Sequence, residues 1–285
     1  MRKIGVLVDN TAQFPYPSFP GESLIRIIPH DVSLNGQVFP AGEGLKVSQL
    51  PAFARGKHPP KLIPPSPEKF NQTLIGMSFE FEAVIVLTHS SHLSSTFSNA
   101  NLAATSLKGR LPVVVIDTNT FSAGLGILAQ LAAQAIYEGA NLIEVEHLIR
   151  QQAAHTYSVI CCPGLSYLSQ NGIVDAAQAV VGEMLSLMPV FSFEDERITP
   201  IEKMRNIRNI IEFFIEFVEE FDQLRHIAII QSVPPLLPET RSIRQAFAEN
   251  YPHTSYTEHN QNLATALLFS PRLIGLIAIE KITSN

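Results

Sequence analysis

Three short apolar runs, each ending in a polar turn, most constrain how this chain can fold. The runs cover residues 4–8, 83–87 and 112–116 and consist almost entirely of aliphatic side chains. Such runs are typical of strands buried on both faces of a parallel sheet. Helical patterns over residues 68–77, 97–107 and 123–138 lie between or after them, as parallel connections require. The sequence therefore predicts an α/β N-terminal half built on a parallel sheet.

The polar turns at the ends of these runs are the first candidates for a binding site. Ligands in open α/β sheets lie outside the carboxyl ends of the strands. One turn carries Asn10 and Thr11, and another carries Ser90 and Ser91. We expect the two serines at the start of the following helix, where hydroxyls, free N–H groups and the helix dipole suit a carboxylate or phosphate. The alternative is that they are ordinary turn and capping residues.

The segment between the first two runs contains local signals of its own. Asn35-Gly36 within residues 31–39 predicts a hairpin with a type I′ turn, after a strand at residues 24–28. Residues 40–67 form a surface passage rich in Pro and Gly. Ser66 followed by Pro67 predicts a capped helix start.

The pattern changes after residue 155. Strands are expected at residues 159–162, 227–230 and 273–279, with an antiparallel pair at 189–193 and 197–203. A strongly amphipathic helix is expected over residues 205–221. We therefore predict two domains, an α/β domain over residues 1–155 and an α+β domain with an antiparallel sheet over residues 156–285.

Composition excludes several classes of protein. The 285 residues include 46% hydrophobic and 16% charged residues, and the net charge is -6. Without a basic stripe, nucleic acid is not an expected partner. No apolar run approaches the roughly 18 residues of a membrane span, so a cytoplasmic protein is expected. Cys161 and Cys162 are adjacent within a predicted strand and are expected to be packing residues, not a disulfide.

Catalytic and metal sites were weighed at the same turns. His89 and His92 have the spacing of a ligand pair, but the sequence offers no third or fourth ligand at a recognisable spacing. A hydrolase would use Ser90 or Ser91 with one of these histidines, but no Gly-x-Ser-x-Gly elbow is present. Gly124-Leu125-Gly126 lacks the third glycine of a phosphate loop and indicates close helix packing. The sequence thus predicts no catalytic residue, no metal and no cofactor.

A series of short motifs, taken in order, resembles the DegV family of bacterial fatty-acid-binding proteins. The resemblance covers essentially the whole chain. The matching blocks are Asp9-Asn10-Thr11, Pro65-Ser66-Pro67 with Phe70, Ser90-Ser91-His92-Leu93-Ser94-Ser95-Thr96, Ile116-Asp117-Thr118 with Gly124-Leu125-Gly126, Leu165-Ser166-Tyr167-Leu168 and Lys203-Met204-Arg205.

The resemblance implies both a fold and a ligand. The family joins an α/β domain to an α+β domain and holds an acyl chain in an apolar tunnel. By this resemblance the chain is expected to bind a long-chain fatty acid or a similar lipid, without catalysis, as a carrier, sensor or store. Its carboxylate is expected at Ser90 and Ser91. The implied lipid-binding residues are Ser90, Ser91, Asn10, Thr11, Ser66, Phe121 and Arg205.

The chain departs from the family at positions that surround the carboxylate. The family arginine after the Tyr-Leu block corresponds to Ile173, and the family histidine near the C-terminus corresponds to Leu268. These groups help present the carboxylate to a partner acyl kinase, so coupling to such a kinase is doubtful. Arg272 or His259 could take over the role from nearby. A serine hydrolase of small acyl esters and a structural or interaction protein without ligand remain the alternatives.

Overall fold

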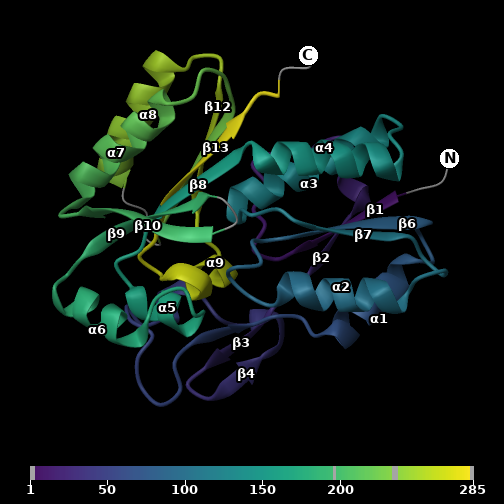
Figure 1. The fold of residues 1–285 in the computed structure, drawn as a ribbon, viewed down its shortest axis with the longest axis horizontal. Helices are drawn as coiled ribbons and strands as arrows, with labels where there is room; N and C mark the ends of the chain where they lie inside the picture. The colour runs from purple at the N-terminus through teal and green to yellow at the C-terminus, as the bar shows by residue number, and fades with distance from the viewer. Residues whose placement is uncertain (1–3, 195–196, 233–236, 283–285) are drawn as a thin grey trace. The chain divides into compact units, whose positions relative to one another are not determined.

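The computed structural model describes residues 4–194, 197–232 and 237–282 (Figure 1). The chain forms two compact units. One contains the residues up to Gly44 together with Leu62–Ala154, and the other contains Leu45–Lys61 together with the residues from His155 onward.

The first unit is built on the predicted parallel sheet. Its strand order is β2-β1-β6-β7, and every neighbouring pair runs parallel. The bounds are β1 Ile4–Asp9, β2 Ile25–Ile28, β6 Ala83–Thr88 and β7 Val113–Asp117. Each predicted apolar run is a strand, which confirms the prediction from the sequence.

Two pairs of helices cover the two faces of this sheet (Figure 1). One pair is α1 Pro67–Met77 and α2 Thr96–Ser106, and the other is α3 Ser122–Tyr137 and α4 Leu142–Ala154. The first pair packs Phe70, Leu74 and Ala100 against Leu7 and Val86 of the sheet in one apolar cluster. A fully buried side chain of the size of Phe70 or Leu74 contributes about 1.5–3 kcal/mol, so this layer stabilises the packing of the helices on the sheet.

The local signals of the first unit are confirmed. Asn35 and Gly36 have φ values of 53° and 81°, as a type I′ turn requires. They join β3 Asp31–Leu34 to β4 Gln37–Phe39, and β5 Lys61–Ile63 completes a sheet of order β4-β3-β5. Ser66 accepts a hydrogen bond from the Lys69 N–H at 3.2 Å and caps α1. Short 3₁₀ turns occupy Glu22–Leu24, Pro40–Gly42 and Val47–Gln49.

The second unit holds a six-stranded sheet of order β10-β9-β8-β13-β11-β12. All neighbouring pairs are antiparallel except β11 and β12, which run parallel. The strands are β8 Thr156–Cys161, β9 Met188–Glu194, β10 Arg197–Met204, β11 Leu224–Gln231, β12 Ser255–Asn260 and β13 Ile274–Glu280. The helices are α5 Leu165–Gln170, α6 Ala176–Met184, α7 Ile207–Glu219, α8 Leu237–Asn250 and α9 Leu263–Phe269. The predicted amphipathic helix is α7, which buries Ile210, Phe214 and Val218.

The segment Leu45–Lys61 is held in the second unit by polar contacts. The Ala54 N–H donates to Ser166 Oγ at 2.8 Å, and the Tyr167 hydroxyl donates to the Pro51 carbonyl at 2.6 Å. Arg55 forms an ion pair with Glu183, whose side chain is fully buried. These contacts explain why a segment from the first third of the chain packs with its second half.

Two smaller expectations also agree with the structure. Cys161 and Cys162 are buried and free of a disulfide. A Cβ atom at Gly126 would lie 2.0 Å from the Gln13 carbonyl oxygen, so the glycine permits close backbone packing. Among the described helices, none is long and apolar enough to span a membrane.

Candidate functional site

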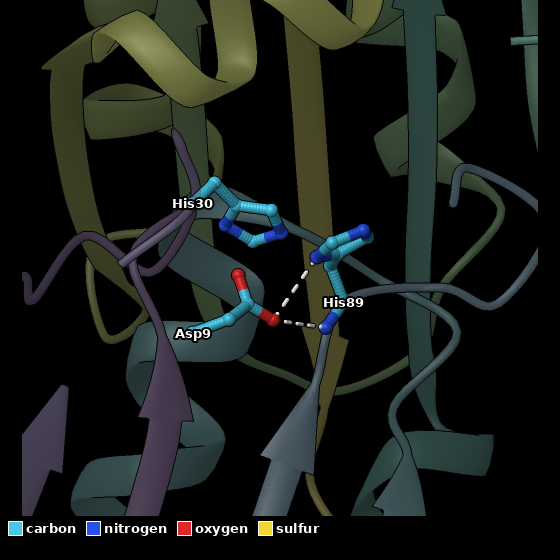
Figure 2. A group of neighbouring side chains, drawn as sticks. All are labelled: Asp9, His30 and His89. Atoms are coloured by element: carbon cyan, nitrogen blue, oxygen red, sulfur yellow. Dashed lines mark hydrogen bonds and ion pairs between the residues drawn. The ribbon is translucent and has the colours of Figure 1, made fainter. Parts of the chain in front are cut away.

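The carboxyl ends of β1 and β6 place their terminal side chains next to each other. The two strands are parallel neighbours in register, with Val8 opposite Leu87. Asp9 ends β1 and His89 follows the last residue of β6, while His30 follows β2 on the other side of β1. Figure 2 shows the three side chains converging at this edge of the sheet.

Asp9 lies at the centre of the hydrogen bonds at this edge. Its Oδ1 accepts from the Thr11 N–H at 2.9 Å and from the Thr11 hydroxyl at 2.6 Å. Its Oδ2 accepts from the His89 N–H at 2.7 Å and lies 3.0 Å from His89 Nδ1 (Figure 2). Both oxygens of a buried carboxylate are therefore satisfied, as burial of a charge requires.

The other side of His89 faces a hydroxyl. His89 Nε2 lies 2.8 Å from Ser94 Oγ, and Ser94 Oγ lies 2.8 Å from Thr96 Oγ1. Ser94 Oγ also accepts from the Thr96 N–H at 3.2 Å. A continuous line of hydrogen bonds thus runs from Asp9 through His89 to Ser94.

His30 closes the line from the other side. Its Nε2 lies 3.0 Å from Thr96 Oγ1 and its Nδ1 lies 2.6 Å from Asn10 Oδ1. Asn10 Oδ1 also accepts from the His30 N–H at 3.1 Å, so Nδ1 must carry a proton to donate to the same oxygen. In a neutral His30 the acceptor is then Nε2, and the Thr96 hydroxyl proton points to it. We refer to Asp9, His89, Ser94, Thr96, His30 and Asn10 as the polar network.

The two ionisable groups at the centre have strongly shifted pKa values. Burial raises the pKa of Asp9, but the nearby His89 and His30 and the hydrogen bonds from His89 and Thr11 outweigh it. The pKa of Asp9 therefore lies well below its ordinary value, and the group is a carboxylate at neutral pH. Burial lowers the pKa of His30 to about 3, against a smaller raising effect of Asp9. His30 is thus neutral.

The same residues include donors that metal ions prefer. One ligand-type atom from each of Asp9, His30 and His89 lies within 4.8 Å of the others. Two imidazoles and one carboxylate are a donor set for zinc or iron. All four ring nitrogens, however, already have hydrogen-bond partners at 2.6–3.0 Å. A metal ion would have to displace them, so the geometry fits a hydrogen-bonded network better.

Ser90 and Ser91 lie in the turn after β6, but not where the sequence predicted. Helix α2 begins at Thr96 and its N-cap is Ser95. The expectation that Ser90 and Ser91 start this helix was therefore wrong, because the N-cap lies five positions after Ser90.

Residues at the end of β7 and in the turn after it bind most of the polar groups of the two serines. The Ser90 N–H donates to the Thr120 carbonyl at 2.9 Å, and the Ser90 hydroxyl donates to Asn119 Oδ1 at 3.2 Å. The Ser91 N–H donates to the Asp117 carboxylate at 3.1 Å. Ser91 is partly exposed, whereas Ser90 is fully buried.

The remaining predicted site residues fall in different surroundings. Asn10 and Thr11 belong to the hydrogen bonds around Asp9 and His30, as described above. Ser66 caps α1. Phe121 is fully buried and is the N-cap residue of α3, and Arg205 is an exposed residue of the second unit. The structure thus brings Asn10 and Thr11 together and gives Ser66 a capping role.

The positions where the family arginine and histidine were expected lie in the second unit. Leu268 is fully buried in α9, and Ile173 is half-buried after α5. His259 lies in β12 with Nε2 3.0 Å from Thr257 Oγ1. The Arg272 guanidinium lies 5.7 Å from the centre of the Phe53 ring.

An apolar groove lies within the second unit, beside α6. It has a volume of about 640 Å³. Its walls come from α5, α6, β9 and β10 and the segments that join them, and they include Leu165, Ile173, Val181, Leu187 and Phe191. A volume of this size is typical of sites for small organic ligands.

Sequence reasoning missed the polar network. It identified the turn with Asn10 and Thr11 and the turn with Ser90 and Ser91 as candidate binding sites. It did not pair Asp9 with His89. The available signal was that polar residues after neighbouring parallel strands meet at one edge. His30 gave no such signal. It follows β2, and the sequence did not show that this strand is the neighbour of β1 in the sheet.

Comparisons with known proteins agree with this fold. A family model described as "Uncharacterised protein, DegV family" matches residues 3–281. A relative from Thermotoga maritima named fatty acid-binding protein is 27% identical over 225 residues, which are 76% of this chain and 77% of the relative.

Two solved structures show the same architecture. A fatty acid binding DegV family protein from Streptococcus agalactiae has a TM-score of 0.85 and 21% identity, covering 99% of this chain and 100% of that one. The Streptococcus pneumoniae Fatty Acid Kinase (Fak) B3 protein, loaded with linoleic acid, has a TM-score of 0.84 and 16% identity, covering 98% and 100%. Both confirm the predicted α/β and α+β halves.

The pKa of His30 leads to a prediction about stability and pH. Its pKa is 6.5 ordinarily and about 3 in the fold, so below pH 6.5 the unfolded chain binds a proton that the folded chain does not. The free energy of unfolding should therefore decrease as the pH is lowered from 6.5 to 3. This group contributes a loss of about 1.4 kcal/mol per pH unit. Urea unfolding at a series of pH values, followed by circular dichroism, measures the slope. His30→Gln should reduce the slope, and His147→Gln, which removes an exposed histidine of the same unit, is the control. An equal slope in wild type and His30→Gln would contradict the assignment.

Proposed function

The chain belongs to the DegV family, as its motifs predicted, and we propose on this basis that it binds a long-chain fatty acid or a similar lipid. The observation that carries the proposal is the family match over residues 3–281. A relative of 27% identity, named a fatty acid-binding protein, supports it. The role we propose is that of a carrier, sensor or store.

We propose that the apolar groove of the second unit receives the acyl chain. Its walls are almost entirely hydrocarbon, with Gln178 as the single amide side chain among the lining residues. Val181 and its neighbours Met184 and Leu185 are 54%, 75% and 65% exposed, which is costly for apolar side chains in water. Each methylene buried there would contribute about 0.8 kcal/mol, so burial of an acyl chain in the groove would be strongly favourable.

The first prediction of this proposal is that lipid co-purifies with the protein. Mass spectrometry of extracts from freshly purified, denatured protein should find a fatty acid near stoichiometric amounts. Val181→Asp should weaken binding by roughly 2 kcal/mol, because it places a carboxylate against the hydrocarbon of the ligand.

The matched control is Val180→Asp. Val180 is the preceding residue of α6, is 47% exposed and does not line the groove. It introduces the same charge into the same helix and should leave the bound lipid unchanged. An extract without lipid would count against lipid binding itself, whereas equal effects of the two substitutions would move the acyl chain elsewhere.

As a separate proposal that does not depend on the groove, we propose that the Ser90-Ser91 turn of the first unit holds the carboxylate, with the Ser91 hydroxyl as the main donor. The Ser90 hydroxyl and both backbone N–H groups donate to residues at the end of β7 and in the turn after it, so the Ser91 hydroxyl is the group left to donate. Asn10, Thr11, Ser66, Phe121 and Arg205 stay in the proposal as residues implied by the family.

The double substitution Ser90→Ala with Ser91→Ala should weaken acyl binding by about 1–3 kcal/mol, the usual loss of a hydrogen bond to a charged group. Ser91→Ala alone should account for most of it. Titration with a fluorescent fatty acid measures the affinity. Ser78→Ala, an exposed serine at the end of α1, is the control. Unchanged affinity in the double variant would place the head group elsewhere.

We propose finally that this protein delivers its ligand poorly to an acyl kinase. The family arginine and histidine correspond to Ile173 and Leu268, which cannot compensate charge on a transferring phosphoryl group. In a coupled assay with a fatty acid kinase, turnover should be at least about tenfold below that of a member with both groups. His259→Ala and Arg272→Ala test whether those residues compensate. Turnover equal to that of such a member would refute the proposal.

A further inference from the structure

The line Asp9, His89 and Ser94 has the geometry of a nucleophilic triad. The carboxylate oxygen lies 3.0 Å from Nδ1 of the imidazole, and Nε2 lies 2.8 Å from the serine oxygen. These are the distances of a base that is oriented by an acid and placed to take a proton from a hydroxyl. We propose that the protein hydrolyses carboxylic esters, with Ser94 as nucleophile, His89 as general base and Asp9 as the group that orients His89.

This arrangement differs from the hydrolase considered from the sequence. That alternative paired His89 or His92 with Ser90 or Ser91, which lie too close along the turn. Ser94 lies five residues after His89, and the turn brings its hydroxyl back to the imidazole. The chain order Asp, His, Ser also occurs among known serine hydrolases.

Burial differs among the three groups. Asp9 is 1% exposed and His89 is fully buried, and the hydrogen bond from His89 Nδ1 to Asp9 holds the imidazole in one orientation. Ser94 is half-buried, so it is the most accessible of the three residues. The four hydrogen bonds to the Asp9 oxygens hold the carboxylate in place.

The rest of the network leaves the Ser94 proton two acceptors, His89 Nε2 and Thr96 Oγ1, each 2.8 Å away. Asn10 fixes the proton of His30 on Nδ1, so the Thr96 hydroxyl donates to His30 Nε2. Asp9 in turn fixes the proton of His89 on Nδ1, which makes His89 Nε2 an acceptor. The Thr96 N–H, 3.2 Å from Ser94 Oγ, holds the nucleophile in position. Thr96, His30 and Asn10 are therefore positioning residues.

The start of α2 supplies a place for negative charge. Ser94 lies two residues before the first residue of this helix of 11 residues. The N–H groups of a first helical turn have no carbonyl partner within the helix, so those of Phe97 and Ser98 are available to the oxygen of a tetrahedral intermediate. The positive end of the helix dipole adds to this stabilisation.

The reaction follows from these positions. Ser94 Oγ adds to the ester carbonyl carbon as its proton passes to His89 Nε2. The bond to the alkoxy oxygen breaks, and the departing alcohol takes the proton from His89, which leaves an acyl ester on Ser94. Water then adds to this ester and gives a proton to His89. The bond to Ser94 Oγ breaks, Ser94 regains the proton, and a carboxylic acid is released.

The proposal goes beyond lipid binding and stands on the first unit alone. Incubation of the whole purified protein with a fluorophosphonate should add one label, and peptide mapping should place it on Ser94. The protein should also hydrolyse p-nitrophenyl butyrate. Ser94→Ala should lose the label and reduce hydrolysis at least about 100-fold, and His89→Gln should reduce both by a similar factor.

Ser95→Ala is the matched control. Ser95 is the next residue, is exposed, and its side chain forms no capping hydrogen bond, so label and hydrolysis should remain at wild-type level. The label site on the wild-type protein does not depend on whether any variant folds. No label on Ser94, or equal hydrolysis by wild type and Ser94→Ala, would overturn the proposal. Lipid found in the same preparation would show that ligand binding stands independently of that result.

Discussion

The buried carboxylate of Asp9 is the constraint on which the polar edge of the first unit depends. A charge removed from water is stable only if its oxygens are fully hydrogen-bonded. Thr11 and His89 supply the four donors, and two of these are backbone N–H groups. The carboxylate therefore fixes the path of two turns at once, one after β1 and one after β6. The placement of Ser94 and Thr96 follows from the second turn.

The parallel sheet makes this constraint possible. Asp9 and His89 are 80 positions apart in the sequence. They come into contact because β1 and β6 are neighbouring parallel strands that end at the same edge of the sheet. The apolar layer of Phe70, Leu74 and Ala100 holds the strands in register from one face. The packing of the helices stabilises the sheet, and the sheet brings Asp9 and His89 together at one edge.

Periodicity could predict most of the fold, because it depends on local residues. The apolar runs, the Asn35-Gly36 turn and the Ser66 cap each carry their own physical signal. No local signal in the sequence predicts that Leu45–Lys61 packs with the second unit. This packing depends on the contact of Arg55 with Glu183, which is 128 residues away. For the site, residue types indicated the right turns, yet the partner of each side chain required the strand order. Ser90 and Ser91 were chosen over Ser94 because the sequence could not show that the turn brings the Ser94 hydroxyl back to the His89 imidazole.

The two histidines of the network sit in one low-dielectric pocket but have different roles. Their ring centres are 5.3 Å apart, so two imidazolium ions there would repel each other strongly. Asn10 offers His30 only a neutral acceptor, whereas Asp9 offers His89 a negative one. The same buried charge that holds the two turns together therefore also orients the His89 ring, whose other nitrogen faces Ser94.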